Sequence, residues 1–244
     1  MIAFIPAAGL GTRLKPYTLT KPKALVEIGG KSLLELAITK LKRFGYTRFV
    51  VNVHHFADQI IDALAKNDNF GMEIFISDER NGLLDTGGGI LQAANFRLPD
   101  EEMLVYNVDV LSDINLDRFR AIHHLRETPV TLACRVRESS RQLLFDDLHL
   151  CGWTNKQTGQ VRMARHLCSL QEFAFSGIHL LSPAFFPLVN EQGAFSIIDV
   201  YLRLAETHKL SYYNHSYDYW ADLGKVPQLE QLQAEVSEKG FFWI

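Results

Sequence analysis

Residues 4–23 read FIPAAGLGTRLKPYTLTKPK, and this stretch decides the fold of the chain. The apolar residues 1–5 predict a buried strand, which runs into a small, glycine-rich turn at residues 7–11. Glycines let a backbone approach a phosphate closely, and consecutive N–H groups form an anion-binding concavity. Arg13 adds a planar guanidinium and Lys23 a mobile ammonium. We therefore expect a triphosphate site at the carboxyl end of the first strand, where open α/β sheets bind ligands.

Two better-known phosphate motifs are excluded by single positions. The dinucleotide fingerprint needs a third glycine where this chain has Leu14. A Walker A loop ending at residues 30–32 needs a glycine where the chain has Leu25. Ser32 and Glu35 instead form a capping box, so residues 29–32 are interpreted as a turn followed by the start of a helix.

The order of predicted elements gives the fold class. In the first half, strands are expected at 2–5, 48–53, 72–77 and 103–107, and helices at 32–44, 55–66, 87–96 and 115–126. In the second half, strands are expected at 129–136, 143–154, 173–181 and 210–214, and helices near 183–189, 196–206 and 225–237. The alternation in the first half implies right-handed βαβ units. We predict an α/β fold with a Rossmann-like mixed, mostly parallel sheet flanked by helices.

Composition excludes several classes of protein. The chain has 244 residues, 47% of them hydrophobic, which is enough for one large α/β domain. The net charge of -3 gives no basic footprint for nucleic acid, and no apolar run reaches the roughly 20 residues that cross a bilayer. The N-terminus reads as a strand and not as a signal peptide. Cys134, Cys151 and Cys168 are far apart and form no C-x-x-C motif, so we expect reduced thiols in a cytoplasmic protein.

Residues 7–16 (AAGLGTRLKP) followed by 20–23 (TKPK) resemble the signature of the sugar-1-phosphate nucleotidyltransferases. These enzymes make nucleotide sugars from a nucleoside triphosphate (NTP) and a sugar 1-phosphate, releasing pyrophosphate. Four more segments match family motifs in the expected order: DTGGGILQ (85–92), VYNVD (105–109), FSGIHLLSP (175–183) and YWADLG (219–224). The resemblance implies the nucleotide-diphospho-sugar transferase fold. It also implies a single domain over 1–244, with a nucleotide-binding half (1–112) and a sugar-binding half (113–244).

The resemblance also implies roles for particular residues. Arg13 and Lys23 would be catalytic, binding the β,γ-phosphates and the α-phosphate. The nucleotide would be bound by Ala8, Gly9, Gly11, Thr12, Asp85 and Gly88, with Gly88 beneath the base. The sugar would be bound by Asn107, Ser176 and Gly177. Asp109 and Asp222 would hold Mg²⁺, a cation that prefers carboxylate, phosphate and water oxygens.

The chain departs from the family pattern at two places. Many relatives carry an E-K-P motif whose lysine contacts the sugar phosphate, and the corresponding residues 151–166 lack it. Lys156, Arg162 and Arg165 are the candidate replacements. The second departure is Lys225, which follows the YWADLG motif where relatives usually have threonine.

Substrate choice rests on finer features. The triple glycine at 87–89 and the stretch GAFSIIDV (193–200) resemble the N-acetylmuramate-1-phosphate uridylyltransferase subgroup. We expect UTP and an N-acetylated amino-sugar 1-phosphate such as N-acetylmuramate 1-phosphate. A mannose- or heptose-1-phosphate guanylyltransferase is the alternative, and a non-catalytic regulatory protein that binds a nucleotide sugar is an alternative of another class. The expected partners are these small molecules, with a monomer or homodimer in solution.

Three further expectations concern single segments. Asn52 follows a predicted strand and should lie at the ligand edge of the sheet. Residues 78–80 (Asp-Glu-Arg) are interpreted as a charged loop that needs no function. The apolar tail 240–244 (GFFWI) is expected to dock, on its own body or on a second subunit, because burying such side chains contributes roughly 1.5–3 kcal/mol each.

Overall fold

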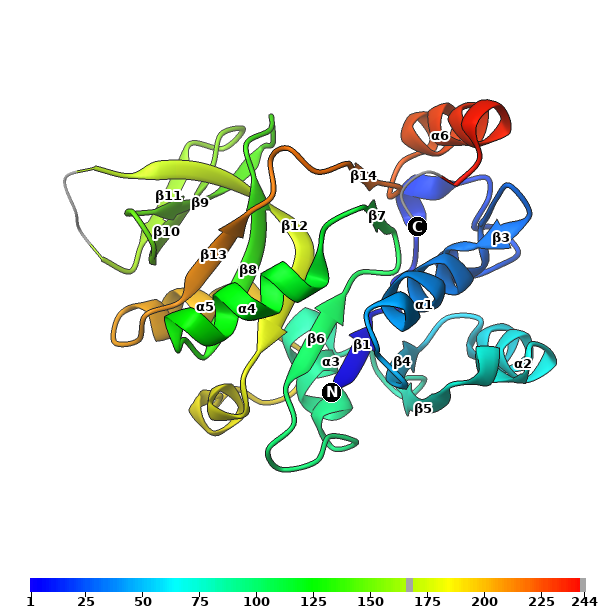
Figure 1. Cartoon of the computed structure of the whole chain (residues 1–244), viewed down its shortest axis with the longest axis horizontal. Coiled ribbons are helices and arrows are strands. Elements are labelled where there is room, and N and C mark those ends of the chain that lie inside the picture. Colours follow the sequence, from blue (N-terminus) through cyan, green and yellow to red (C-terminus); the bar gives the residue numbers. More distant parts are fainter. Residues whose placement is uncertain (166–168, 242–244) are drawn as a thin grey trace.

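One mixed β-sheet runs through the computed structural model, which describes residues 1–165 and 169–241 (Figure 1). Its strands follow the order β11-β10-β9-β12-β6-β1-β4-β5, and β8 joins it by pairing with β12 and β13. The strands of this sheet are β1 (Ile2–Ile5), β4 (Arg48–Val53), β5 (Glu73–Asp78), β6 (Met103–Tyr106), β8 (Val130–Arg135), β9 (Arg141–Phe145), β10 (Leu150–Asn155), β11 (Gln160–Met163), β12 (Gln171–Leu181) and β13 (Ser211–Asn214). Two small ribbons are separate, β2 (Glu27–Ile28) with β3 (Lys31–Ser32) and β7 (Val110–Ser112) with β14 (Trp220–Asp222).

The part of the sheet from the first half is parallel. β1 pairs in parallel with both β4 and β6, and β4 pairs in parallel with β5. The chain therefore starts in the middle of this part, moves outward through β4 and β5, and returns to the other side of β1 with β6. Such a reversal leaves a crevice at the carboxyl ends of the two central strands. Here those strands are β1 and β6, which end at Ile5 and Tyr106.

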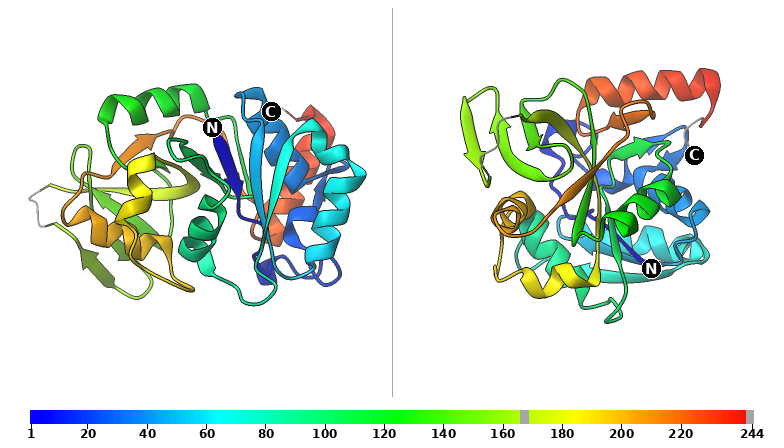
Figure 2. Two further views of the ribbon diagram at one scale, coloured as in Figure 1. Left: turned by 90° about the horizontal axis from the view of Figure 1, so that it is seen from below. Right: turned by 60° about the vertical axis from the view of Figure 1, so that its left-hand side comes forward.

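Helices cover both faces of the sheet (Figures 1 and 2). The helices are α1 (Leu33–Arg43), α2 (Ala57–Lys66), α3 (Asp85–Ala94), α4 (Leu116–Arg126), α5 (Ile197–Ala205) and α6 (Val226–Lys239), with short 3₁₀ helices at Thr12–Leu14, Lys23–Leu25, Asp68–Gly71 and Pro183–Leu188. Residues of α1, α2, α4 and α6 belong to one buried cluster, and residues of α3 and α5 to the other. No helix among the described residues is long and apolar enough to cross a membrane.

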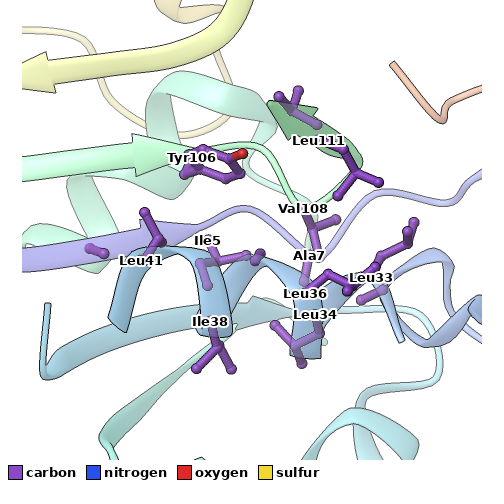
Figure 3. Packing of buried hydrophobic residues seen from close by; sticks show 14 of the residues in the cluster. Ile5, Ala7, Leu33, Leu34, Leu36, Ile38, Leu41, Tyr106, Val108 and Leu111 are labelled. Carbon is purple, nitrogen blue, oxygen red and sulfur yellow. The ribbon is translucent and has the colours of Figure 1, made fainter. Parts of the chain in front are cut away.

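Strand β1 shows how the sequence produces this layering. Ala3 and Ile5 pack into the cluster of α1, whereas Ile2 and Phe4 pack into the cluster of α3 and α5. Successive side chains of a strand point to opposite faces, so a strand covered on both sides reads as a continuous apolar run. Figure 3 shows the α1 side, where Leu41, Leu36 and Leu33 follow one another along β1 and the segment after it, from Ile5 to Ala7.

The Ser32 half of the predicted capping box is confirmed, whereas the Glu35 carboxylate pairs with Lys31 Nζ (3.2 Å). Ser32 is the N-cap, and its hydroxyl accepts a hydrogen bond of 3.1 Å from the N–H of Glu35. The two glycines before it, Gly29 and Gly30, have φ angles of 54° and 78°. These are left-handed values that glycine adopts at little cost, so the β2–β3 connection is a tight turn.

The second half differs from the first in strand direction. The long strand β12 pairs antiparallel with β6, β8 and β9, and β9, β10 and β11 continue as an antiparallel meander. The single β segment predicted at 143–154 is thus two strands joined by a turn at 146–149. The predictions also missed β2, β3, β7, β11 and β14, which have two to four residues each and offer too short a pattern to recognise.

The docking expected for the tail is confirmed at Phe241. Its ring packs against the α1 cluster, and a methyl group built on Gly29 would lie 2.8 Å from Phe241 Cζ. The ammonium of Lys31 lies 5.7 Å from the centre of the same ring. The tail therefore returns to the body of its own chain beside the β2–β3 turn. The remaining tail residues 242–244 lie outside the described residues.

Candidate functional site

The crevice at the ends of β1 and β6 contains a cavity of about 250 Å³. Its walls come from the turn after β1, from the ends of β4 and β5, from the start of α3 and from the segment after β6. The lining residues are Phe4, Pro6, Ala7, Ala8, Gly9, Lys23, Asn52, Glu79, Leu83, Asp85, Thr86, Gly89, Asn107, Val108 and Asp109. Six of the predicted site residues therefore line one cavity: Ala8, Gly9, Lys23, Asp85, Asn107 and Asp109.

The glycine-rich turn is held by a side chain from the neighbouring strand. Asn52 Oδ1 accepts hydrogen bonds from the N–H groups of Ala7 (2.6 Å) and Ala8 (3.1 Å). Ala8 therefore forms a wall of the cavity, and its N–H is not available to a phosphate. Among the described residues, nothing accepts a hydrogen bond from the N–H groups of Gly9 or Gly11. These groups are the ones left to bind an anion, as the sequence predicted for this turn.

Gly9 and Gly11 serve different purposes in that turn. A methyl group built on Gly9 would meet nothing within 4 Å, so the missing side chain leaves the cavity open. Gly11 has a φ angle of 61°, and a methyl group there would lie 3.0 Å from Thr18 Cγ2 and 3.1 Å from Lys23 Cβ. Both the backbone conformation and the close packing therefore require glycine at position 11. The chain then enters the 3₁₀ helix Thr12–Leu14, which carries Arg13.

Glu79 belongs to this site, which corrects the interpretation of residues 78–80 as a loop without function. The Glu79 side chain is 2% exposed and lines the cavity. Its two carboxylate oxygens accept hydrogen bonds from Asn52 Nδ2 (2.7 Å) and from the N–H of Leu84 (3.0 Å). Glu79 therefore connects the turn after β1 to the start of α3. The available signal was its position one residue after β5, where polar side chains reach the ligand edge of the sheet.

The triple glycine at 87–89 is divided between two roles, and contact of Gly88 with the base stays a prediction. A methyl group on Gly88 would lie 2.2 Å from the Gly193 carbonyl oxygen, and one on Gly87 would lie 2.2 Å from the Phe195 ring. These two glycines let α3 pack tightly against residues 193–195 of the second half. Gly89 faces the cavity instead, with Glu79 Oε1 and Asn52 Nδ2 its nearest neighbours.

The ribbon β7–β14 brings the two predicted metal ligands together. Asp222 lies opposite Val110 in this antiparallel pair, and the N–H of Leu223 donates to the Asp109 carbonyl (2.9 Å). The position that a methyl group on Gly224 would take is 2.8 Å from Asp222 Oδ1 and 3.3 Å from Asp109 Oδ2. Both carboxylates therefore face one point, although more than a hundred residues separate them in the chain.

Two cations lie beside these carboxylates. Arg13 Nη2 is 2.8 Å from the same point over Gly224, and Lys23 Nζ forms an ion pair with Asp109 Oδ2. All four residues predicted for phosphate and metal therefore converge. Burial raises the pKa of Asp222, and the charge of Asp109 raises it further. The Gly224 N–H, Lys23 and Arg13 oppose that shift, so the carboxylate pair is an environment that favours an additional cation.

The predicted sugar residues lie on β12 and after β6. Gly177 has a φ angle of 76°, and a methyl group there would lie 2.6 Å from Asn107 Nδ2. Gly177 therefore leaves room for the Asn107 side chain, which lines the cavity. Ser176 is buried, and its hydroxyl hydrogen-bonds His215 Nε2 (2.7 Å), while its carbonyl accepts from Trp220 Nε1 (3.0 Å). Direct contact of Ser176 with a sugar stays a prediction.

Comparison with known proteins identifies the family. The model of the family described as nucleotidyl transferase matches residues 2–145, more than half of the chain. The protein belongs to the nucleotidyl transferase family. The resemblance seen in its sequence motifs is thereby confirmed, and the matched region contains the phosphate turn, Lys23, the α3 glycines and Asp109.

Individual relatives of this nucleotidyl transferase differ in substrate. The chain is 43% identical over 115 residues to N-acetylmuramate alpha-1-phosphate uridylyltransferase of Neisseria meningitidis, an overlap of 47% of this chain and 49% of that protein. The match thus spans about half the length of that relative. The chain is also 28% identical to mannose-1-phosphate guanyltransferase of Yarrowia lipolytica, over 92% of this chain and 61% of the relative.

The fold is shared with solved structures of the family. A putative glucose-1-phosphate thymidylyltransferase from Bacillus anthracis superposes with a TM-score of 0.80 over 99% of both chains, at 17% sequence identity. The predicted fold class is therefore confirmed for this member, including the mixed sheet and the helices on both of its faces.

Proposed function

We propose that this protein transfers a nucleoside monophosphate from an NTP to a sugar 1-phosphate, with release of pyrophosphate. UTP and N-acetylmuramate 1-phosphate are the proposed substrates. The convergence of Arg13, Lys23, Asp109 and Asp222 beside the cavity carries the proposal. The 43% identity to an N-acetylmuramate alpha-1-phosphate uridylyltransferase over 115 residues supports the choice of substrates.

The reaction needs no protein nucleophile. An oxygen of the sugar phosphate attacks the α-phosphorus of the NTP, the bond from that phosphorus to the bridging oxygen breaks, and pyrophosphate leaves. Both substrates are anions, so charge repulsion and alignment are the main obstacles. The N–H groups of the turn 9–11 and the Arg13 guanidinium would bind the triphosphate. Asn52 holds the backbone of this turn before the substrates arrive, which favours electrostatic stabilisation of the transition state by its N–H groups.

Asp109 and Asp222 fit the requirements of Mg²⁺. The paired carboxylates supply hard oxygen ligands, the type that Mg²⁺ prefers. The described residues contain no cluster of three or more His, Cys, Asp or Glu that could hold a metal ion, so phosphate and water would have to complete the coordination. Mg²⁺ typically takes one or two carboxylates and fills its remaining positions with phosphate and water oxygens. When bound, the ion would offset charge on the attacked phosphate.

Lys23 would change partner when the substrates bind. Its ammonium now neutralises Asp109, the carboxylate that the proposal assigns to the metal. A metal at Asp109 and a triphosphate beside Gly9 would together attract Lys23 to the α-phosphate. The flexible lysine stem permits such a shift over a short distance. The ion pair would thus keep the unliganded site neutralised until an NTP arrives with its cation.

Two other functions compete with this one. A guanylyltransferase for mannose or heptose 1-phosphate is supported by the relative in Yarrowia lipolytica, whose match covers most of the chain. A non-catalytic regulator that binds a nucleotide sugar would not need Arg13, Lys23, Asp109 and Asp222 at one point. Their convergence favours an enzyme over a regulator.

A pyrophosphate-release screen tests the proposal. The wild-type protein is incubated with Mg²⁺ and each of the four NTPs, against a panel of N-acetylmuramate, N-acetylglucosamine, glucose, mannose and heptose 1-phosphates. We expect UTP with N-acetylmuramate 1-phosphate to react fastest, and an Asp222→Asn sample purified in parallel to release almost no pyrophosphate. GTP with mannose or heptose 1-phosphate as the fastest pair would establish the alternative enzyme. Saturable binding of a nucleotide sugar without turnover would establish the regulator.

A further inference from the structure

The second half needs a cation for the sugar phosphate, and the candidates from the sequence are engaged elsewhere. Lys156 pairs with Glu172, and Arg162 pairs with Asp199. Arg165 donates to two backbone carbonyls at the end of α5. Each of these side chains already has its partner away from Asp222. None of the three candidates therefore replaces the E-K-P lysine as the contact to the sugar phosphate.

Arg137 lies where such a cation is needed. It follows β8, and its Nη2 donates to the Phe175 carbonyl of β12 (3.1 Å) while Nη1 donates to the Glu138 carbonyl (3.2 Å). Its guanidinium carbon is 4.4 Å from the centre of the Trp220 ring, a cation–π contact. Trp220 is itself fixed by the hydrogen bond from Nε1 to the Ser176 carbonyl. Arg137 is therefore held between the strand of the metal ligand, β14, and the predicted sugar strand, β12.

The nearest carboxylate charge acting on Arg137 is that of Asp222, which interacts with it only at longer range. Throughout residues 1–165 and 169–241, no carboxylate forms an ion pair with it, and its buried Nε has no hydrogen-bond partner. A guanidinium stays charged in proteins, and a half-buried one without a counter-ion is a ready site for an anion. Arg137 also lines a groove of about 380 Å³ that contains Asp222 and Trp220. On its other side it lines a cavity of about 240 Å³ with Gln142 and Trp153.

We propose that Arg137 binds the phosphate group of the sugar 1-phosphate and replaces the lysine of the absent E-K-P motif. The inference rests on the proposed function. A phosphate that attacks beside Asp109 and Asp222 must carry its sugar toward β12, and Arg137 lies between these two places. Lys225 lines the same groove, but it is exposed, and within the described part of the chain its side chain forms no hydrogen bond or ion pair. The stacked guanidinium is already oriented, so less conformational freedom is lost when it binds an anion.

Kinetics of two Arg137 variants test the proposal. Arg137→Gln should raise the KM for the sugar 1-phosphate so that kcat/KM falls about 100-fold, since a charge-assisted hydrogen bond to the phosphate is lost. Arg137→Lys, which keeps the charge but loses the planar fork, should recover part of that loss. The KM for the NTP should change by less than about twofold. Lys156→Gln is the matched control, and we expect wild-type kinetics from it because Lys156 pairs with Glu172 away from the groove.

A comparison of two sugars identifies the group that Arg137 binds. N-acetylmuramate 1-phosphate carries a carboxylate that N-acetylglucosamine 1-phosphate lacks, and the two share the phosphate. Arg137→Gln should weaken both equally if the guanidinium binds phosphate. An effect confined to the carboxylate-bearing sugar would overturn the assignment.

Further outcomes separate this inference from the proposed function. Wild-type turnover with an unchanged KM for the sugar 1-phosphate in both variants would overturn the role of Arg137 alone. Absence of wild-type turnover with every substrate pair would overturn both proposals. Thermal unfolding of each variant is measured in parallel. If Arg137→Gln lacks a cooperative transition, Arg137→Lys alone decides, and an unchanged KM in that variant would contradict the proposal.

Discussion

The two halves of the molecule contribute charged groups to one site by different routes. In the first half, Arg13 and Lys23 come from a single stretch directly after β1, and Asn52 fixes the turn between that strand and Arg13. In the second half, Asp222, Ser176 and Arg137 come from three segments that are far apart in the sequence. They are brought together by β7–β14 and β12–β8 pairing and by the contacts of Trp220. The residues of a local motif can be recognised together in the sequence. In a site assembled from distant strands, a residue from another segment can take over the role of a missing one.

The carboxylate of Asp222 tests the link between the halves and has the largest expected effect. Asp222→Asn keeps the shape of the side chain and its hydrogen bond from Gly224. We expect kcat to fall at least about 1000-fold, the scale at which preorganised electrostatic groups act. The melting temperature without ligand should hold or rise, because one of two repelling charges is removed.

The exposed residue Asp147 supplies the control for this test. Asp147→Asn should keep wild-type kcat and the wild-type melting temperature, as measured by pyrophosphate release and thermal unfolding. An Asp222→Asn enzyme with full activity would show that Asp222 on β14 has no part in the reaction. It would contradict the claim that both halves contribute charged groups to one site.

The pair Gly88 and Gly89 tests the contact between the halves with one identical substitution. Gly88→Ala places a methyl group 2.2 Å from the Gly193 carbonyl, so we expect unfolding to become easier by about 1–3 kcal/mol. Gly89→Ala instead disturbs Glu79 and Asn52 at the cavity, and should raise the KM for the NTP about tenfold with little loss of stability. Urea unfolding and kinetics of both variants distinguish the roles. Equal stability of the two would contradict the packing assigned to Gly88.

Buried histidines of the second half should make the folded protein less stable in acid. Burial lowers the pKa of His123 and His215 to about 4 and that of His179 to about 3. In the unfolded chain, a histidine binds a proton below about pH 6.5. In the folded protein, these three histidines bind a proton only near pH 4 or below. The unfolded state therefore takes up more protons as the pH falls below 6.5, and the native state loses stability there.

His123 allows a single-site test of this pH dependence. His123→Gln should reduce the loss of unfolding free energy between pH 7 and pH 5 by about 2 kcal/mol, as measured by urea unfolding at both values. An unchanged loss in His123→Gln would exclude the burial of His123 as a cause of the pH dependence.

Sequence patterns predicted the helices and strands of the first half because the apolar residues of each follow one clear spacing. Strands such as β4 read as apolar runs, and α1 carries both its cap and its apolar spacing. The second half was harder because its antiparallel strands are joined by short turns, as between β9 and β10. The ribbons β2–β3 and β7–β14 arise from tertiary pairing and leave no pattern of their own.

The site shows the same division. Motif residues such as Gly9, Lys23 and Asp109 were found from the sequence because family resemblance assigns them directly. Glu79 and Arg137 were missed because their roles depend on partners far along the chain, Asn52 for one and Trp220 for the other. Nothing in the local sequence shows that Gly88 leaves room for the distant Gly193 carbonyl, because that contact depends on how the two halves pack.

A double-mutant cycle tests most directly whether Asp109 and Asp222 act as one unit formed by both halves. kcat/KM is measured for Asp109→Asn, Asp222→Asn and the double variant, with thermal unfolding to confirm that each folds. Residues that hold a single cation together lose their function when either is changed. We therefore predict that the double variant is about as inactive as the worse single variant. Losses that multiply in the double variant would show that the two carboxylates act independently and would contradict the shared site.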